Sequence, residues 1–263
     1  MSDDHLDNRK SPRYYVRKYL DSISGDLQGK TVADLPSGTG VTSRLLKDHG
    51  ATVLAFDLFP ENFREKDIVC RKADVPKGIP LDDNTADMLV CQEGIEHFSD
   101  QLKALKEFSR VMKKGGKLLI TAPSYSNLAA RISYLVFESE TSRRMPPNEI
   151  DDIWKEDKAV SDKIYHGHIF MIGLQKLRVL AKLAGFRIFE VKYLRLSKRS
   201  LVFLPFFYPW IFVSSWLRFR RHLKKHDTMP REVLLRVYGE QFRLNVSVKN
   251  LLNHHLFVIF EKE

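Results

Sequence analysis

Two acidic residues and two glycines stand where a chain can hold a nucleotide-like ligand. A mostly apolar stretch that begins at Thr31 contains Asp34 and runs into a turn with Gly38 and Gly40. Glycine has no Cβ and tolerates positive φ, so backbone at this turn can come close to a ligand. A helix expected over 41–49 would add unpaired N–H groups. The spacing therefore predicts a cofactor site where a strand meets a helix.

A second acidic residue follows the next predicted strand. The apolar stretch 51–56 ends on Asp57, where a carboxylate can accept hydrogen bonds from both hydroxyls of a ribose. A dinucleotide would also need a seat for its pyrophosphate, usually Gly-x-Gly-x-x-Gly, and here Pro36 and Ser43 occupy two of those glycine positions. The sequence favours an adenosine without a pyrophosphate, and a nicotinamide-dependent oxidoreductase is the alternative.

Strands and helices alternate along most of the chain. Apolar periodicity predicts a helix after each of several strands, and this alternation implies a parallel sheet covered on both faces. The predicted strands cover residues 31–35, 51–56, 68–72, 86–91, 117–122, 186–194 and 254–260, and the predicted helices cover 12–24, 41–49, 101–112, 126–137, 174–184 and 231–242.

The motifs resemble those of the class I S-adenosylmethionine-dependent methyltransferases. Val32-Ala33-Asp34-Leu35-Pro36-Ser37-Gly38-Thr39-Gly40 with Asp57 is similar to the first two motifs of that family. The stretch 87–97 resembles its fourth strand and the following turn, and 105–123 its next helix and fifth strand. The likeness covers about residues 28–125. Pro36 departs from it, because the family usually has a glycine there.

The resemblance implies the fold and the cofactor. The fold would be α/β, a three-layer Rossmann-like sandwich with a mostly parallel seven-stranded sheet and an antiparallel last strand. The cofactor would be S-adenosyl-L-methionine, with Asp74 accepting a hydrogen bond from the adenine amino group; a turn-capping role is the alternative for Asp74. The residues expected to bind the cofactor are Asp34, Pro36, Ser37, Gly38, Gly40, Asp57, Leu58, Asp74, Gln92 and Glu93.

Length and cysteine content indicate the number of domains and argue against a disulfide-rich or zinc-binding protein. A chain of 263 residues suits a single domain, 1–263, that begins with a polar tail and a helix over 1–27. Cys70 and Cys91 are its two cysteines, too few for a disulfide framework or a zinc cluster, and no metal site is expected. The polar N-terminus lacks the apolar segment of a secretory signal. We expect a cytoplasmic protein.

The positive charge is confined to the second half of the chain. Residues 1–130 carry 19 basic and 19 acidic side chains, so the net charge of +10 belongs entirely to 131–263. Such asymmetry indicates an anionic partner. Nucleic acid is not expected, because methyltransferases that act on base amino groups carry an Asn- or Asp-Pro-Pro-aromatic motif where this chain has Gln92-Glu93-Gly94-Ile95.

Two segments are predicted to be insertions. Residues 138–168 are polar and are expected to form a lid over the site. Residues 195–245 contain the uncharged run 201–217 between basic flanks. As a helix this run would reach about 26 Å, short of the ~30 Å hydrocarbon core, and Pro205 and Pro209 are expected to break it. We expect 198–225 to make peripheral contact with an anionic membrane from the cytosolic side; packing as core or as a dimer surface is the alternative.

The sequence offers several candidates for the catalytic residues and for the acceptor. The candidates for a general base are Tyr125, His166 and His168, which follow the fifth strand or the lid. Pro123-Ser124-Tyr125-Ser126-Asn127-Leu128 and Gly167-His168-Ile169 resemble stretches of bacterial methyltransferases of surface-glycan pathways. That resemblance implies an amphiphilic, lipid-linked or glycan acceptor. A catalytically silent scaffold that binds a membrane or a partner is the other alternative, and the sequence leaves the oligomeric state undetermined.

Overall fold

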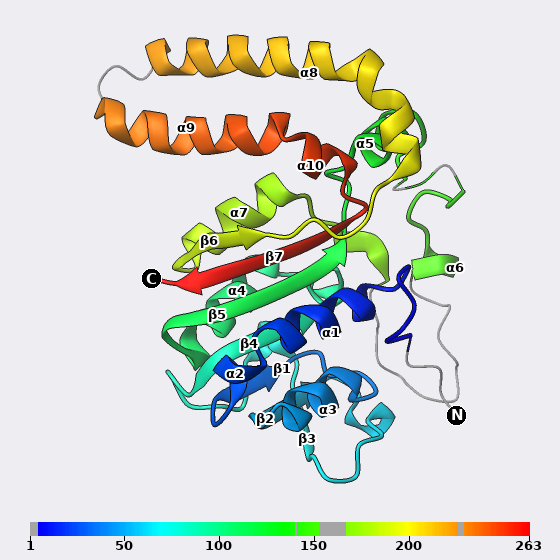
Figure 1. Cartoon of the computed structure of the whole chain (residues 1–263), viewed down its shortest axis with the longest axis vertical. Coiled ribbons are helices and arrows are strands. Elements are labelled where there is room, and N and C mark those ends of the chain that lie inside the picture. Colours follow the sequence, from blue (N-terminus) through cyan, green and yellow to red (C-terminus); the bar gives the residue numbers. More distant parts are fainter. Residues whose placement is uncertain (1–4, 140, 142, 153–166, 226–228) are drawn as a thin grey trace.

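A seven-stranded sheet with helices on both faces forms the body of the protein (Figure 1). The computed structural model describes residues 5–139, 141, 143–152, 167–225 and 229–263. The strand order is β3-β2-β1-β4-β5-β7-β6, and β7 runs antiparallel to both β5 and β6. The strands are β1 (Thr31–Asp34), β2 (Thr52–Asp57), β3 (Cys70–Lys72), β4 (Ala86–Gln92), β5 (Met112–Pro123), β6 (Phe186–Val191) and β7 (His255–Lys262).

The helices lie in two layers and one projecting pair. The α-helices are α1 (Pro12–Ser22), α2 (Ser24–Leu27), α3 (Val41–Asp48), α4 (Gln101–Val111), α5 (Leu128–Phe137), α6 (Glu149–Asp152), α7 (Leu174–Leu183), α8 (Lys198–Lys225), α9 (Arg231–Val246) and α10 (Val248–Leu252). Short 3-10 helices are η1 (Pro60–Asn62), η2 (Val75–Lys77), η3 (Ile95–His97) and η4 (His168–Phe170). This confirms the predicted three-layer α/β fold.

Each face of the sheet has its own apolar core, because side chains alternate between the faces along each strand. On one face, Leu20 of α1 and Leu46 of α3 pack over Val32 and Val90. On the other, α4 and α7 pack through a larger cluster that includes Leu105, Phe108, Leu177 and Phe260. Both layers hold the strands rigidly, so the loops that follow the carboxyl ends of the strands have fixed starting points.

The predicted strands and helices match the observed ones with small shifts at their ends. The fifth strand is longer than predicted: β5 begins at Met112, and Gly115 and Gly116 lie inside it. Gly116 is required there because a Cβ would lie 2.9 Å from the Asp87 carbonyl oxygen and 2.8 Å from the Lys113 carbonyl oxygen. The sixth strand is shorter than predicted and ends at Val191.

Helices α8 and α9 form an antiparallel pair beyond the β6 edge of the sheet (Figure 1). The expectation that Pro205 and Pro209 break the apolar segment is wrong, because both prolines lie inside the 28-residue α8. A proline removes one backbone hydrogen bond and kinks a helix without having to end it, and Figure 1 shows α8 bending in its first half. By length and composition α8 could cross a membrane, although only 11% of its most apolar window is buried within the protein.

Candidate functional site

The candidate site lies at the carboxyl edge of the sheet, where the strand order reverses between β1 and β4. In open α/β sheets the chain leaves neighbouring strands in opposite directions at such a point and opens a crevice for a ligand. The loop 35–40 follows β1 at this edge, and beside it lie Gln92, the last residue of β4, and the turn at 93–94. Most residues predicted to bind a cofactor belong to these two segments or follow β2.

The glycine loop has the conformation that its sequence predicts. Gly38 has a φ of 52° and Gly40 a φ of 92°, values that side chains other than glycine rarely adopt. A Cβ added at Gly38 would meet nothing within 4 Å, whereas one at Gly40 would lie 2.9 Å from the Phe63 ring and 2.8 Å from the Glu65 side chain. The loop is therefore open beside Gly38 and covered beside Gly40.

Asp57 holds the glycine loop in place. Its Oδ2 accepts a hydrogen bond of 2.8 Å from the Gly38 N–H, and its Oδ1 accepts one of 2.9 Å from the Phe59 N–H. The side chain is largely buried and turned toward the loop, as a ribose-binding carboxylate would be. Each carboxylate oxygen keeps a second acceptor position for a hydroxyl. The tether to Gly38 is a contact that the sequence did not reveal.

Asp34 is a buried carboxylate beneath the same loop. It is fully shielded from solvent, and Ser43 Oγ donates a 2.5 Å hydrogen bond to its Oδ2. Its Oδ1 has no hydrogen-bond partner among the residues that the structure describes. Burial, reinforced by the nearby charge of Asp57 and opposed by the Ser43 hydrogen bond, raises the pKa of Asp34 to about 7. This carboxyl therefore binds a proton at higher pH than an ordinary aspartate does.

Pro36 is fixed by close packing against the turn after β4. The Leu35–Pro36 peptide bond is cis, and the proline ring lies against Gly94. A Cβ at Gly94 would stand 2.2 Å from Pro36 Cδ and 3.1 Å from Cys91 Sγ. Only a residue without a side chain fits there, so Gly94 fixes how closely the turn after β4 approaches the cofactor loop.

Three other predicted residues follow the ends of β1, β2 and β3. Ser37 is buried, donates its N–H to the Phe56 carbonyl, and pairs its Oγ with Cys70 Sγ at 3.3 Å. Leu58 is half-buried directly after Asp57. Asp74 makes a 2.8 Å ion pair with Lys77, and its side chain does not cap η2. The structure thus disfavours the capping alternative for Asp74, and the adenine contact stays a prediction.

Gln92 and Glu93 point to different parts of the site. Gln92 Oε1 accepts a 2.8 Å hydrogen bond from Thr42 Oγ1 at the start of α3, on the cofactor side. Glu93 has a φ of 49°, an unusual value for a residue with a side chain. Its carboxylate is turned across β5, where Thr121 Oγ1 donates to it at 2.7 Å. We predicted both as cofactor ligands, but only Gln92 contacts the glycine-loop helix.

His255 is a site residue that sequence reasoning missed. It opens β7, and its Nε2 lies 2.8 Å from both carboxylate oxygens of Glu93. The two residues are 162 positions apart, and the sequence contains no spacing signal that joins them. The antiparallel β7, paired with β5 through Pro123 and His255, brings the histidine to the carboxyl edge.

Two of the three predicted general bases belong to segments that the structure describes. Tyr125 follows β5, and its ring packs edge-on against Tyr134 at 5.2 Å and beside Gly173. His168 begins η4, which packs against η3 after β4. His166 lies outside the described residues, as does much of the predicted lid. In the described part of the lid, Arg144 pairs with the buried Asp152 at 3.1 Å, and the Gly167 N–H donates to the Asp152 carbonyl.

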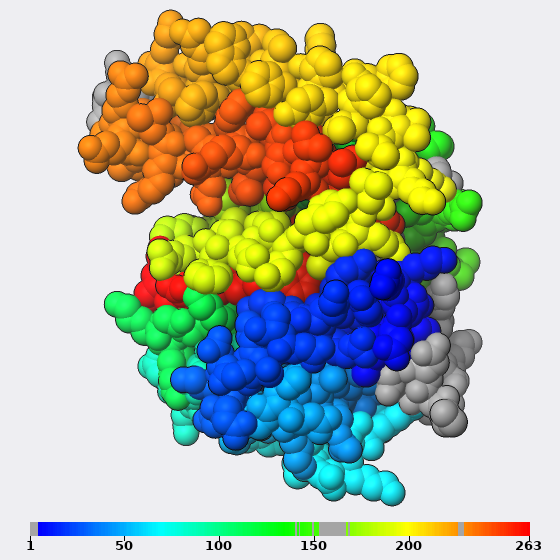
Figure 2. Space-filling model, in the orientation of Figure 1, coloured from blue at the N-terminus to red at the C-terminus, as the bar shows by residue number. Residues whose placement is uncertain are grey.

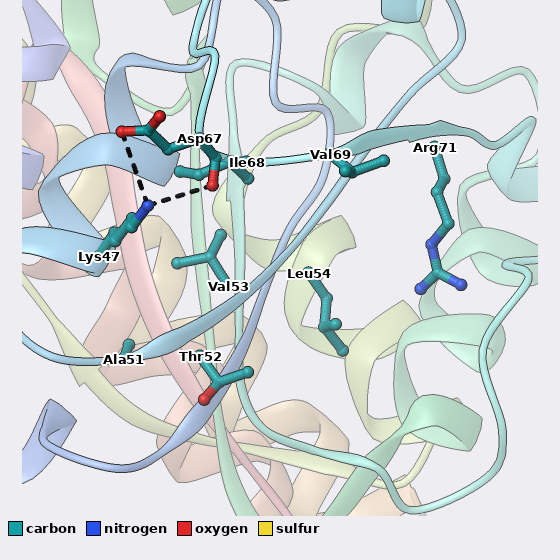
Figure 3. Close-up of a pocket in the computed structure, with 9 residues that line it drawn as sticks. All are labelled: Lys47, Ala51, Thr52, Val53, Leu54, Asp67, Ile68, Val69 and Arg71. Carbon is teal, nitrogen blue, oxygen red and sulfur yellow. Dashed lines mark hydrogen bonds and ion pairs between the residues drawn. The ribbon is translucent and has the colours of Figure 1, made fainter.

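A surface groove of about 530 Å³ lies elsewhere (Figure 3). It is bordered by 51–54 at the amino end of β2 and by 67–71 beside β3. At one end Lys47 Nζ donates to the Asp67 carbonyl oxygen at 3.1 Å. Because the groove is at the amino end of β2, Asp57 and the glycine loop are at the opposite end of the strand. We therefore assign the candidate site to the carboxyl edge.

Comparison with known proteins shows similarity to methyltransferases. Residues 33–120 match the family described as methyltransferase domain. Over 117 residues the chain is 32% identical to the ubiquinone/menaquinone biosynthesis C-methyltransferase UbiE of Enterobacter sp. (strain 638), covering 40% of this chain and 47% of the relative. It is 34% identical over 113 residues to demethylmenaquinone methyltransferase of Corynebacterium urealyticum, covering 41% and 46%. The chain thus spans about half the length of the curated relatives it matches.

Solved structures extend the likeness to the whole fold. An S-adenosylmethionine-dependent methyltransferase from Mesorhizobium loti superimposes with a TM-score of 0.54 at 16% identity, covering 93% of this chain and 96% of that one. One from Archaeoglobus fulgidus gives the same TM-score and identity and covers 98% and 97%. These matches confirm the predicted fold.

Proposed function

We propose, on the premise that this chain carries a class I S-adenosylmethionine-dependent methyltransferase domain, that the protein methylates an amphiphilic acceptor at the cytosolic face of a membrane. The domain match supports the methyl transfer. The observation that supports the choice of acceptor is the exposed apolar stripe of α8. The first turns of α8 are hydrogen-bonded to the segment that follows β5 at the carboxyl edge of the sheet.

The residues around the glycine loop fit the cofactor. The backbone is open beside Gly38. Asp57 faces the glycine loop, and its carboxylate oxygens can each accept a further hydrogen bond. The buried Oδ1 of Asp34 has no hydrogen-bond partner among the described residues. Asp57 would hold the ribose, and the N–H groups at the start of α3 would face the amino-acid end. The bound cofactor supplies a methyl group on a positively charged sulfur. The protein holds the acceptor in line with the methyl group and excludes water, and both effects lower the barrier to an in-line displacement.

Removing the Asp57 carboxylate is expected to weaken cofactor binding by about 10- to 100-fold. Asp57→Ala removes the ribose acceptor and releases Gly38, and a hydrogen bond to a charged group is worth about 1.5–3 kcal/mol. Titration calorimetry with S-adenosylhomocysteine measures the change, and Asp67→Ala in the distant groove is the matched control. Wild-type protein that binds no S-adenosylhomocysteine would contradict the proposed activity, and equal binding by Asp57→Ala would contradict this site.

One side of α8 is an exposed apolar stripe. Val202, Phe206, Trp210, Val213 and Leu217 follow each other at intervals of three or four residues, and each is more than half exposed. Intervals of this kind place side chains on a single helix face. Figure 2 shows α8 forming the outer margin of the molecule. A contiguous exposed apolar stripe of this kind indicates a binding face.

Basic side chains border the stripe. Lys198 and Arg199 begin α8, and its last turns carry Arg218, Arg220, Arg221, Lys224 and Lys225 without an acidic residue. Arg220 lies over the Trp216 ring at 5.0 Å. Each Lys or Arg near an anionic bilayer adds about 1 kcal/mol to binding. An apolar stripe with basic ends suits the interface of an anionic membrane better than it suits another protein.

Helix α9 favours a location in the interface over a span. It packs along α8 through Phe242, which stacks with Phe219 at 5.6 Å and meets Phe212 edge-on. Its other faces bear charges, and its Glu240 pairs with Arg178 of α7 at 2.8 Å. Charged side chains are costly in hydrocarbon, so α8 cannot enter a bilayer fully while α9 remains attached. The pair fits an interfacial element that immerses one stripe.

The beginning of α8 lies at the carboxyl edge of the sheet. Ser200 is fully buried there and accepts the Ala129 N–H at 3.0 Å, and its Oγ donates to Asn127 Oδ1 at 3.2 Å. Asn127 and Ala129 belong to the start of α5, directly after β5. The membrane surface would therefore adjoin the site, which favours an acceptor with a lipid chain or a glycan on a lipid carrier. The curated relatives are named for ubiquinone/menaquinone biosynthesis and as a demethylmenaquinone methyltransferase.

Replacing two residues of the stripe is expected to abolish membrane binding. Phe206→Ser with Trp210→Ser removes two side chains that are each 77% exposed, so folding should be unaffected. Each substitution removes at least about 1.5 kcal/mol of transfer free energy. The two together are expected to weaken the partition of the protein onto vesicles by roughly 100-fold. Flotation with vesicles of phosphatidylcholine and phosphatidylglycerol measures this.

The control variant is Val69→Ser, which removes an 80% exposed apolar side chain beside β3 and should float as wild type does. Wild-type protein that stays at the bottom of the gradient would contradict the membrane proposal. A concentration-dependent dimer that Phe206→Ser with Trp210→Ser dissociates would identify the stripe as a contact between two copies instead.

The acceptor itself can be sought in membranes from cells that lack the gene. Wild-type protein with radiolabelled S-adenosylmethionine is expected to label the organic phase of these membranes. Cofactor binding without any labelled product would favour the silent scaffold.

A further inference from the structure

Three strands contribute one polar cluster that the cofactor does not account for. Glu93 follows β4, Thr121 is in β5 and His255 begins β7. Thr121 Oγ1 donates to Glu93 Oε1 at 2.7 Å, and both carboxylate oxygens of Glu93 lie 2.8 Å from His255 Nε2. The side chains of His255 and Glu93 are 14% and 32% exposed. Both side chains are therefore mostly buried but keep some exposure to solvent.

The cluster lies on the acceptor half of the carboxyl edge. The glycine loop and Asp57 follow β1 and β2, on one side of the point where the strand order reverses, and β4, β5 and β7 are on the other. Gln92, which precedes Glu93, bonds Thr42 at the start of α3. The cofactor side and this cluster therefore meet at adjacent residues of one turn, as a methyl donor and an acceptor must.

The hydrogen bonds assign the protons of His255. An ionised carboxylate only accepts hydrogen bonds, so the ring nitrogen that faces Glu93 carries the hydrogen. In the neutral ring the other nitrogen, Nδ1, then has a free lone pair. Nδ1 has no hydrogen-bond partner within the described part of the chain. A carboxylate that orients an imidazole in this way is the arrangement that makes histidine a general base.

We propose that His255, oriented by Glu93, is the general base that deprotonates a hydroxyl group of the acceptor; this rests on the proposed methyl transfer. The acceptor proton moves to Nδ1, and the oxygen electron pair forms the new O–CH3 bond. The bound cofactor would supply the methyl group, and its sulfur would keep the electron pair of the broken S–CH3 bond and become neutral. The imidazolium is stabilised by the Glu93 carboxylate and later returns its proton to solvent. His255 is the catalytic residue, and Glu93 and Thr121 are positioning residues.

His255→Gln tests the base. Glutamine keeps an N–H donor toward Glu93 but has no basic nitrogen. We expect S-adenosylhomocysteine affinity within about twofold of wild type, and a loss of at least about 100-fold in methyl transfer to membranes from cells lacking the gene, because general bases contribute about 10²–10⁴. The matched control is His49→Gln, which alters another histidine–carboxylate pair, 3.0 Å from Asp21 and remote from the site. It should transfer methyl groups normally.

The tautomer of His255 provides a readout that needs no acceptor. In ¹⁵N-histidine-labelled protein, we expect the wild-type ring to carry its hydrogen on Nε2. In Glu93→Gln the side-chain amide can donate to Nε2, so the hydrogen should shift to Nδ1 and transfer should fall with it. A hydrogen on Nδ1 in the wild type, or transfer by His255→Gln within about threefold of wild type, would overturn the proposal. Wild-type protein that fails to bind S-adenosylhomocysteine would instead overturn the proposed function.

Discussion

Gly94→Ala is expected to weaken S-adenosylhomocysteine binding by at least about tenfold and to destabilise the fold by about 1–3 kcal/mol. The new methyl group would lie 2.2 Å from Pro36 Cδ, so either the cofactor loop or the turn after β4 must move, and overpacking of this kind costs that much. The φ of Gly94 is −130°, which alanine adopts freely. The effect would therefore be steric and local to the loop. Calorimetry and urea unfolding measure the two changes.

The control for this substitution is Gly239→Ala. A Cβ at Gly239, inside α9, would meet nothing within 4 Å, and alanine is favoured over glycine in a helix by about 1 kcal/mol. Gly239→Ala should stabilise the protein slightly and leave cofactor affinity unchanged. If Gly94→Ala binds S-adenosylhomocysteine as wild type does, the packing of Gly94 on Pro36 does not determine the shape of the loop.

The glycine loop shows what local sequence can predict. Its conformation depends on residues close together in the chain, so Gly38, Gly40 and the following helix were predicted correctly. The requirement for Gly94 was not predicted, because it arises from a contact with Pro36, which is distant in sequence. The tether from Asp57 to Gly38 joins two strands and was missed for the same reason.

The second half of the site depends on the topology of the sheet. His255 reaches Glu93 only because β7 inserts antiparallel between β5 and β6, and the two residues share no periodicity or motif. Apolar periodicity did place a strand over 254–260, but it could not say which neighbour the strand would pair with. The apolar run 201–217 was likewise identified correctly, whereas the continuity of α8 through Pro205 and Pro209 was not predicted.

Folding stability is expected to fall as pH rises from about 4 to about 7, through Asp34. The folded-state pKa of Asp34 is raised from 3.8 to about 7, so in this window the folded chain binds a proton that the unfolded chain has lost. Fewer protons bound in the unfolded state mean a negative slope of stability against pH. The loss amounts to about 4 kcal/mol and is complete above the folded pKa.

Asp34→Asn isolates this contribution. Asparagine cannot ionise and still accepts the Ser43 hydrogen bond, so the difference in unfolding free energy between variant and wild type should grow from pH 5 to pH 8. Urea unfolding at both pH values measures it. Other carboxylates act in more acidic solution. Hydrogen bonds and ion pairs lower the pKa of three of them, Asp87, Glu107 and Glu261. The stabilisation that these three contribute is lost only at lower pH. A constant difference across this range would show that Asp34 is already ionised in the folded protein.

The same carboxyl links cofactor binding to a proton. S-adenosylhomocysteine carries an ammonium group, and a positive charge bound over the glycine loop favours the ionised form of Asp34 beneath it. Binding at pH 6 should therefore release up to one proton, which calorimetry in buffers of different ionisation enthalpy detects as a change in the observed heat. Asp34→Asn should bind without this buffer dependence. If wild type shows none either, the ammonium group binds too far from Asp34 to change its protonation.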